Sequence, residues 1–165
     1  MFRRCAPLFV LTLLAVPAAV TAQQPVSSKE SGMAAVTASS LKWGPADIPG
    51  FVPGMEMAVV AGDPSKPEPY TLRLRFPKDY VFPAHWHPQT ENLTVLEGKF
   101  VLGMGSKTDK TMLKEYERGD FLTLPGNQPH FGGAKGDNTV IQLHGVGPFG
   151  ITVTEEIPGA AKKKE

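Results

Sequence analysis

Hydrophobic and polar residues alternate along much of the middle of the chain. The clearest stretch is 70–76 (YTLRLRF), in which aromatic and leucine residues alternate with threonine and arginine. Side chains of a strand point alternately to its two faces, so this period of two predicts a half-buried antiparallel strand. The apolar string 56–61 (EMAVVA) predicts an earlier strand, and 139–144 (TVIQLH) predicts a late one.

Short β-prone runs continue along the chain at nearly regular spacing. They are separated by pairs of turn-forming residues: Lys78-Asp79, Glu97-Gly98, Gly105-Ser106, Gly119-Asp120, Pro125-Gly126 and Gly136-Asp137. No segment with a helical period of useful length occurs between residues 41 and 158. Many short strands with turns at this spacing predict an all-β sandwich or barrel.

One hairpin is predicted in more detail, because Glu97-Gly98 lies between two strongly β-prone runs. A two-residue turn there would pair Val95 with Phe100, Leu93 with Leu102 and Glu91 with Met104, all on one face. That row is either the wall of a metal pocket with Glu91 at its end, or an ordinary core with Glu91 at its wet rim. The turn leaves both interpretations open.

The first 40 residues do not follow this pattern. A basic Arg3-Arg4 pair, an apolar run over 7–20 and small residues up to Ala22 are typical of a secretory signal peptide. We expect cleavage after Ala22, a periplasmic or secreted location and no stable membrane insertion, with an uncleaved anchor as the alternative. We further expect a flexible segment over 23–40, one folded domain over 41–158 and a polar tail over 159–165.

Charge and cysteine content narrow the partners and the chemistry. Removal of residues 1–22 takes away Arg3 and Arg4 and leaves 15 basic against 16 acidic residues, a net charge of about −1. That balance provides no strong field to attract nucleic acid. The only cysteine, Cys5, lies in the predicted signal peptide, so a metal in the mature protein must be bound by histidine, carboxylate and water.

Three residues of the types that bind metals are concentrated in residues 85–91 (HWHPQTE). His85 and His87 share one face of a strand, and Glu91 follows after a corner that contains Pro88. A carboxylate beside two imidazoles suits Mn, Fe, Ni or Zn. The alternative is a pair of solvated histidines at the end of a strand.

A second stretch, 119–130 (GDFLTLPGNQPH), is a strand followed by a Gly/Pro turn that leads to one more histidine. Taken together, the two stretches resemble the two motifs of the cupin superfamily. The matching positions are His85, His87, Glu91 and Gly98 in the first motif, and Gly119, Pro125 and His130 in the second. Asp79 stands where the first motif usually begins with glycine, Gly126-Asn127 has the usual turn pair exchanged, and Ala134 replaces a frequent asparagine.

The resemblance covers about residues 79–134. It implies a double-stranded β-helix, a jelly-roll barrel, in a single domain. It also implies that His85, His87, Glu91 and His130 bind one divalent metal ion, which would be Mn, Fe, Ni or Zn. Small cupins are often dimeric, so a homodimer is a further expectation.

The resemblance does not select one activity, because cupins include dioxygenases, decarboxylases, isomerases, lyases and non-catalytic binders. Four protein ligands on an octahedral metal would leave two positions for water, dioxygen or substrate. We expect an exported metal-dependent oxidoreductase of dioxygenase type that acts on a small, oxygen-rich or carboxylated molecule. The alternatives are a non-catalytic small-ligand or metal-binding protein, and a metal-dependent lyase, isomerase or decarboxylase.

Gln142 and His144 are the candidates for additional catalytic residues. They share one face of the predicted strand 139–144. If that face points into the barrel, both side chains reach the substrate or the metal ligands. If it points outward, His144 is an ordinary surface histidine.

Overall fold

A computed structural model describes residues 34–160, and its regular elements are almost all β-strands. The strands are β1 (Gly44–Pro45), β2 (Glu56–Ala61), β3 (Pro69–Phe76), β4 (Val81–Trp86), β5 (Glu91–Glu97), β6 (Lys99–Met104), β7 (Lys114–Glu117), β8 (Phe121–Leu124), β9 (His130–Ala134), β10 (Thr139–Val146) and β11 (Thr152–Val153). Two single 3₁₀ turns, η1 (Ala38–Ser40) and η2 (Lys110–Met112), complete the set. From Val36 onward the described chain forms one compact unit.

Several sequence-based expectations concern residues beyond this range. The predicted signal peptide, most of the predicted flexible segment 23–40 and most of the predicted tail lie outside the described residues. Between residues 34 and 160, no helix has the length and apolar character needed to cross a membrane.

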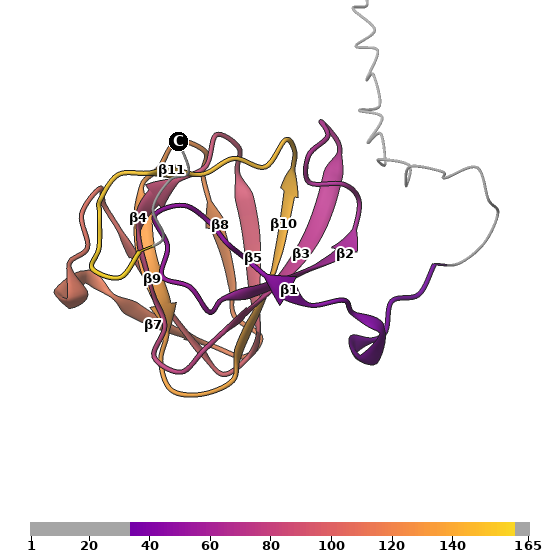
Figure 1. The fold of residues 1–165 in the computed structure, drawn as a ribbon, viewed down its shortest axis with the longest axis horizontal. Helices are drawn as coiled ribbons and strands as arrows, with labels where there is room; N and C mark the ends of the chain where they lie inside the picture. The colour runs from indigo at the N-terminus through magenta and orange to yellow at the C-terminus, as the bar shows by residue number, and fades with distance from the viewer. Residues whose placement is uncertain (1–33, 161–165) are drawn as a thin grey trace, which may run out of the picture. The chain divides into compact units, whose positions relative to one another are not determined.

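The strands form two antiparallel sheets, which confirms the all-β prediction. One sheet has the order β1-β2-β3-β10-β5-β8, and the other has the order β11-β4-β9-β6-β7. Figure 1 shows β4 and β9 on one side of the fold and β3, β5 and β10 on the other. Some neighbours, such as β3 and β10 or β4 and β9, are far apart in sequence, and the pairing of β4 with β9 brings the two motifs together.

The strands predicted from alternation are present with nearly the expected limits. β3 buries Tyr70, Leu72 and Phe76 and leaves the intervening residues partly or fully exposed. β2 spans the predicted string 56–61. β3 lies between β2 and β10. Its Leu74 is opposite Met57 of β2 on one side and Ile141 of β10 on the other.

The predicted hairpin at Glu97-Gly98 is wrong in its pairing. β5 pairs with β8 and β10, whereas β6 belongs to the other sheet and pairs with β7 and β9. Residue Gly98 is therefore a corner between sheets. The other residues of the predicted row are nevertheless buried between the two facing sheets, namely Glu91, Leu93, Val95, Phe100 and Leu102, whereas Met104 is exposed.

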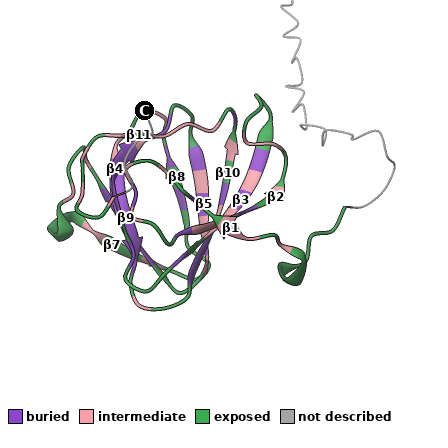
Figure 2. Cartoon of the chain, in the orientation of Figure 1, coloured by how far each residue is buried: buried purple, intermediate pink, exposed green. Residues whose placement is uncertain are grey.

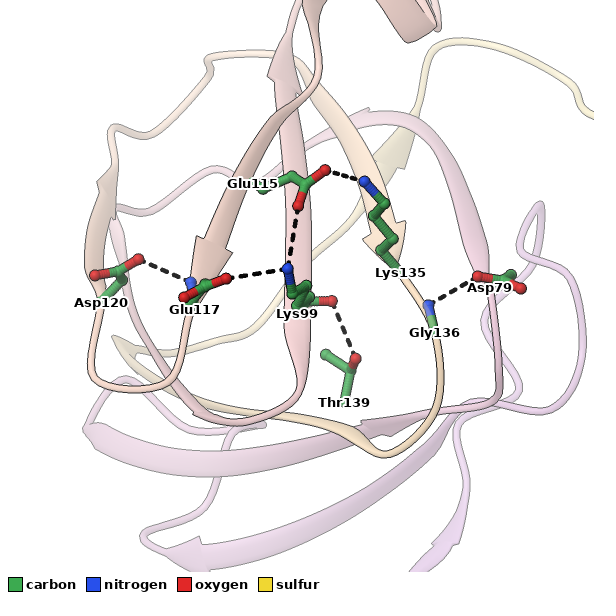
Figure 3. Close-up of polar contacts among 8 residues, drawn as sticks. All are labelled: Asp79, Lys99, Glu115, Glu117, Asp120, Lys135, Gly136 and Thr139. Carbon is green, nitrogen blue, oxygen red and sulfur yellow. Dashed lines mark hydrogen bonds and ion pairs between the residues drawn. The ribbon is translucent and has the colours of Figure 1, made fainter.

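Polar contacts hold this corner in place. Gly98 has a φ of 70°, and Lys99 begins β6 directly after it. The fully buried Thr139 of β10 donates its hydroxyl to the Lys99 carbonyl at 3.0 Å, which links the two sheets. In Figure 3 the Lys99 ammonium lies between Glu115 and Glu117 of β7, at 3.7 and 3.1 Å.

The core between the sheets is rich in aromatic rings. Phe76, Phe82 and Phe100 pack against one another with ring centroids 5.9–6.2 Å apart. Figure 2 shows that the buried positions run along β4, β9 and β5. Phe51 and Phe82 extend this packing to the ring of His85, at 5.0 and 5.3 Å, so the core directly supports the histidine cluster.

Candidate metal centre

Three strands deliver the four predicted ligands to one point between the sheets. His85 lies near the end of β4 and His87 follows that strand, with Trp86 turned to the other side of the chain. His130 begins β9, where its Cα is the direct partner of His85. Glu91 begins β5 in the opposite sheet and reaches the cluster across the interior.

The four side chains are close together and shielded from water. The candidate ligand atoms of the three histidines lie within 4.8 Å of one another. Their ring centroids are 4.4–5.4 Å apart. Glu91 Oε2 lies 3.3 Å from His87 Nε2, and none of the four residues exceeds 7 % exposure. They are therefore not solvated histidines at the end of a strand.

Backbone carbonyls orient all three imidazole rings in the same way. The Nδ1 atoms of His85, His87 and His130 contact the carbonyl oxygens of Pro83, Gly150 and Gln128 at 2.8, 2.8 and 3.0 Å. A carbonyl oxygen only accepts, so each Nδ1 carries the hydrogen and donates it. Each Nε2 therefore presents a lone pair to the cluster, which is the usual arrangement of metal-binding histidines.

Burial keeps these rings neutral. It lowers the pKa of His87 to about 4, against the opposing effect of the Gly150 carbonyl. Burial, followed by the like charge of His130, lowers the pKa of His85 well below its ordinary value. The pKa of His130 is also lowered by burial. Neutral imidazole is the form that binds a metal ion.

Glu91 is buried without full hydrogen bonding. Burial raises its pKa to about 8, and the neighbouring Tyr70 hydroxyl offsets part of that shift. Its Oε1 atom is buried and lacks a hydrogen-bond partner. A buried unpaired carboxylate is costly, and a cation beside it removes the cost. Three neutral nitrogens and this oxygen form a donor set that fits a divalent transition metal or zinc.

A cavity of about 50 Å³ adjoins the cluster. Apart from the four donor residues, its lining consists of isoleucine, leucine, methionine and phenylalanine side chains. Leu93, Phe100 and Leu102 of the predicted pocket wall are among them, whereas Val95 and Met104 are not. A volume of this size holds a metal ion and a few small molecules such as water.

Residues 72–144 match a protein family described as Cupin domain, and the match includes all four donor residues. Residues 72–144 thus resemble a cupin domain. The two antiparallel sheets of residues 34–160 have the cupin fold. The fold that the resemblance implied is thereby confirmed.

Solved structures similar to this cupin domain differ in what they do. The polyketide cyclase RemF from Streptomyces resistomycificus is 14 % identical, with a TM-score of 0.60 over 78 % of this chain and 89 % of that one. DMSP lyase DddQ from Ruegeria pomeroyi is 16 % identical, with a TM-score of 0.51 over 61 % and 51 %. Salicylate 1,2-dioxygenase from Pseudoaminobacter salicylatoxidans is 14 % identical, with a TM-score of 0.50 over 61 % and 29 %. No curated protein sequence matches this chain.

Gln142 and His144 of the cupin domain lie on the face of β10 that points away from the cavity. Ile141 and Leu143 of the same strand line the cavity instead. Gln142 accepts a hydrogen bond from Arg73 Nε at 3.0 Å, and His144 Nδ1 lies 2.8 Å from Thr71 Oγ1 on the outer surface. The structure thus selects the outward alternative, in which neither side chain reaches the metal donors.

Sequence reasoning missed the segment that follows β10. Phe149 packs on the His87 ring at 5.3 Å, Gly150 supplies the carbonyl that orients that ring, and Ile151 lines the cavity. Ile48, before β2, lines it as well. A backbone carbonyl leaves no signal in the residue type, and apolar residues in loops do not show a period, so nothing in the sequence marked these positions.

Proposed function

We propose that this cupin binds one divalent transition metal through His85, His87, His130 and Glu91 and is an enzyme of dioxygenase type acting on a small molecule. The observation that carries the proposal is the common orientation of the three buried imidazoles, each held by a carbonyl so that Nε2 faces the others. When bound, the metal would supply Lewis acidity and open positions for dioxygen or substrate.

The lining of the cavity supports an oxidative reaction over one driven by protein acids and bases. Among the described residues around the cavity, only the four donors titrate. An isomerase, lyase or decarboxylase usually needs a positioned side chain to move a proton. Here the chain's own residues orient the donors, exclude water through the apolar walls and leave proton transfer to Glu91 and the Tyr70 hydroxyl beside it.

A non-catalytic binding protein is the second candidate function. The cavity of about 50 Å³ favours it, because that volume leaves little room for an organic substrate beside a metal ion. The fold does not decide between the two, since similar structures include a cyclase, a lyase and a dioxygenase.

The test compares wild type with Glu91→Gln, purified without a histidine tag. Glutamine keeps the side-chain size and one oxygen donor but removes the negative charge that favours a higher metal oxidation state. Metal content, oxygen uptake and small-ligand affinity are measured on the same samples. For an oxygen-using enzyme, turnover falls far more than metal content. A binding protein instead shows ligand affinity that follows metal occupancy. Fully metallated wild type that consumes no oxygen with Fe, Mn or Ni and a broad substrate panel would refute the enzyme.

A further inference from the structure

The walls of the cavity offer no partner for a second charge on a substrate. Glu91 is the only charged residue type among the described lining residues. Arg73 and Arg75 lie on the outer face of β3, where they donate to Gln142 and Glu56. A carboxylate held away from the metal would lose its hydration there without gaining a counter-ion, which is strongly unfavourable.

The surface groove next to the cavity is acidic. Its volume is about 1060 Å³, and its described lining includes Asp47, Glu155 and Glu156 but no lysine or arginine. Carboxylates at an entrance lower the local concentration of anions and leave neutral molecules unaffected. Used as an entrance, the groove therefore disfavours the same molecules that the inner walls disfavour.

Three side chains line both the groove and the cavity, namely Ile48, Phe149 and Ile151. Phe149 is the largest of them and packs on the His87 ring at 5.3 Å and on Tyr70 at 6.0 Å. Because the cavity is small, a ring-sized body needs more room, and movement of the Phe149 side chain toward the groove would provide it.

We propose that the ligand of the metal centre is a small molecule with oxygen donors at one end and an otherwise uncharged, apolar body, which enters past Phe149. This inference rests on the proposed function and narrows its substrate class. It differs from the sequence-based expectation of an oxygen-rich or carboxylated molecule, because the arginines that would bind a carboxylate are on the outer face of β3.

The first test uses two probes that differ only in a remote charge. 4-Nitrobenzohydroxamic acid and 4-carboxybenzohydroxamic acid share the metal-binding end and are nearly equal in size, and their affinities for the metal-loaded protein are measured by calorimetry. We expect the carboxylated probe to bind at least about tenfold more weakly, equivalent to about 1.4 kcal/mol. Equal binding, or tighter binding of the carboxylated probe, would overturn the proposal.

The second test concerns the entrance. Phe149→Ala should raise the association rate of benzohydroxamic acid, compared at equal metal occupancy, severalfold, and Phe149→Leu should have a smaller effect. Phe121→Ala is the matched control, because Phe121 is 61 % exposed and does not line the cavity. Thermal unfolding of each variant verifies the fold. An unchanged rate in the folded Phe149 variants would show that ligands enter elsewhere.

Metal content separates this inference from the proposed function. A sample that holds metal but does not discriminate between the probes refutes the substrate class and leaves the metal enzyme standing. A sample that holds no metal refutes the proposed function. The substrate class is then tested on that sample with 4-methylphenol and 4-hydroxybenzoate, which need no metal and differ by the same remote charge. Preference for 4-methylphenol supports an apolar ligand, and no preference overturns it.

Discussion

At the scale of single residues, three backbone carbonyls set the chemistry of the site. The carbonyl oxygens of Pro83, Gln128 and Gly150 each accept a hydrogen bond from Nδ1–H of one histidine. Nε2 of each ring therefore carries a free lone pair. Burial then disfavours protonation of those nitrogens and ionisation of Glu91 in the metal-free protein. The three Nε2 atoms therefore stay unprotonated near neutral pH, which is the state that binds a metal cation.

Replacing one imidazole should reduce metal binding without unfolding the barrel. For His130→Ala we expect metal affinity to fall by at least about 10–100-fold, the loss that outer-shell changes alone produce. The apolar core does not depend on this residue, so far-UV circular dichroism should keep its β signature. His144→Ala is the matched control on the outer surface. Unchanged metal content in His130→Ala would show that the cluster does not bind metal.

Glu91 should make the stability of the metal-free protein depend on pH. Burial raises its folded pKa to about 8 from an ordinary value of 4.5. The folded state therefore holds a proton that the unfolded state has released between these values, and this contribution to stability is lost as pH rises from 4.5 to 8. The slope is at most about 1.4 kcal/mol per pH unit.

The measurement is urea unfolding of EDTA-treated wild type and Glu91→Gln across that pH range. The buried histidines act in the opposite direction, since their lowered pKa values cost stability as pH falls below 6.5. They are present in both proteins, so the difference between the two curves isolates Glu91. We expect the advantage of wild type over Glu91→Gln to shrink as pH rises. A constant difference would contradict the assignment.

At the scale of elements, two turns place non-glycine residues in the left-handed backbone region, which their residue types alone do not predict. Asp79, which stands where the first cupin motif usually has glycine, adopts a φ of 50°, and its carboxylate accepts from Gly136 N at 2.8 Å. Asn127 adopts a φ of 60° in the exchanged turn pair. Asp and Asn tolerate this left-handed region better than other non-glycine residues, so these departures preserve the turn geometry.

The Gly98 corner should be more sensitive to substitution than a turn of similar conformation. Gly98 and Gly136 have φ values of 70° and 76°, so alanine at either position costs about 1–2 kcal/mol of backbone strain. A Cβ at Gly98 would also lie 2.7 Å from Thr139 Oγ1 and 2.8 Å from the Asn138 carbonyl, whereas one at Gly136 meets nothing within 4 Å.

Crowding should therefore cost Gly98→Ala a further ~1–3 kcal/mol relative to Gly136→Ala. Urea unfolding of the two variants under the same conditions provides the comparison. Equal destabilisation would show that the corner between the sheets is less tightly packed than the structure indicates.

At the scale of the whole molecule, the candidate metal donors come from both sheets. His85 and His130 come from one sheet and Glu91 from the other, so a bound ion would link them across the interior. Binding to the folded state alone stabilises it by mass action. Unfolded chains do not hold these four groups together, so stability should depend on metal concentration.

We expect added metal to raise the melting temperature of EDTA-treated protein. Free metal at 100 times its Kd contributes about 2.7 kcal/mol, which corresponds to a shift on the order of 5–15 °C for a domain of this size. Differential scanning calorimetry measures it, with His144→Ala responding like wild type and His130→Ala responding little. A shift of the same size in His130→Ala would point to binding elsewhere.

We also propose that the protein is exported and loses residues 1–22. The support is the basic Arg3-Arg4 pair, the apolar run and the small residues before Ala22. Intact-mass measurement of protein recovered from outside the cytoplasm should give a chain that begins at Gln23. A chain that still begins at Met1 would reject this expectation.

The sequence by itself determined the fold class and the residues of the candidate site. Alternation over 70–76 predicted β3, and the i, i+2 spacing of His85 and His87 placed both rings on one face, because both features depend only on the local geometry of a strand. The two motifs supplied Glu91 and His130 through their spacing, which the comparison with known proteins then matched to a cupin domain.

Only the tertiary structure decided which strands are neighbours and which faces point inward. The Glu97-Gly98 turn has the residues of a hairpin, yet it joins different sheets, because β5 finds its partners in β8 and β10. Gln142 and His144 point outward because Ile141 and Leu143 fill the interior. Phe149 and the Gly150 carbonyl complete the site through packing between distant segments, and such contacts have no local pattern in a sequence.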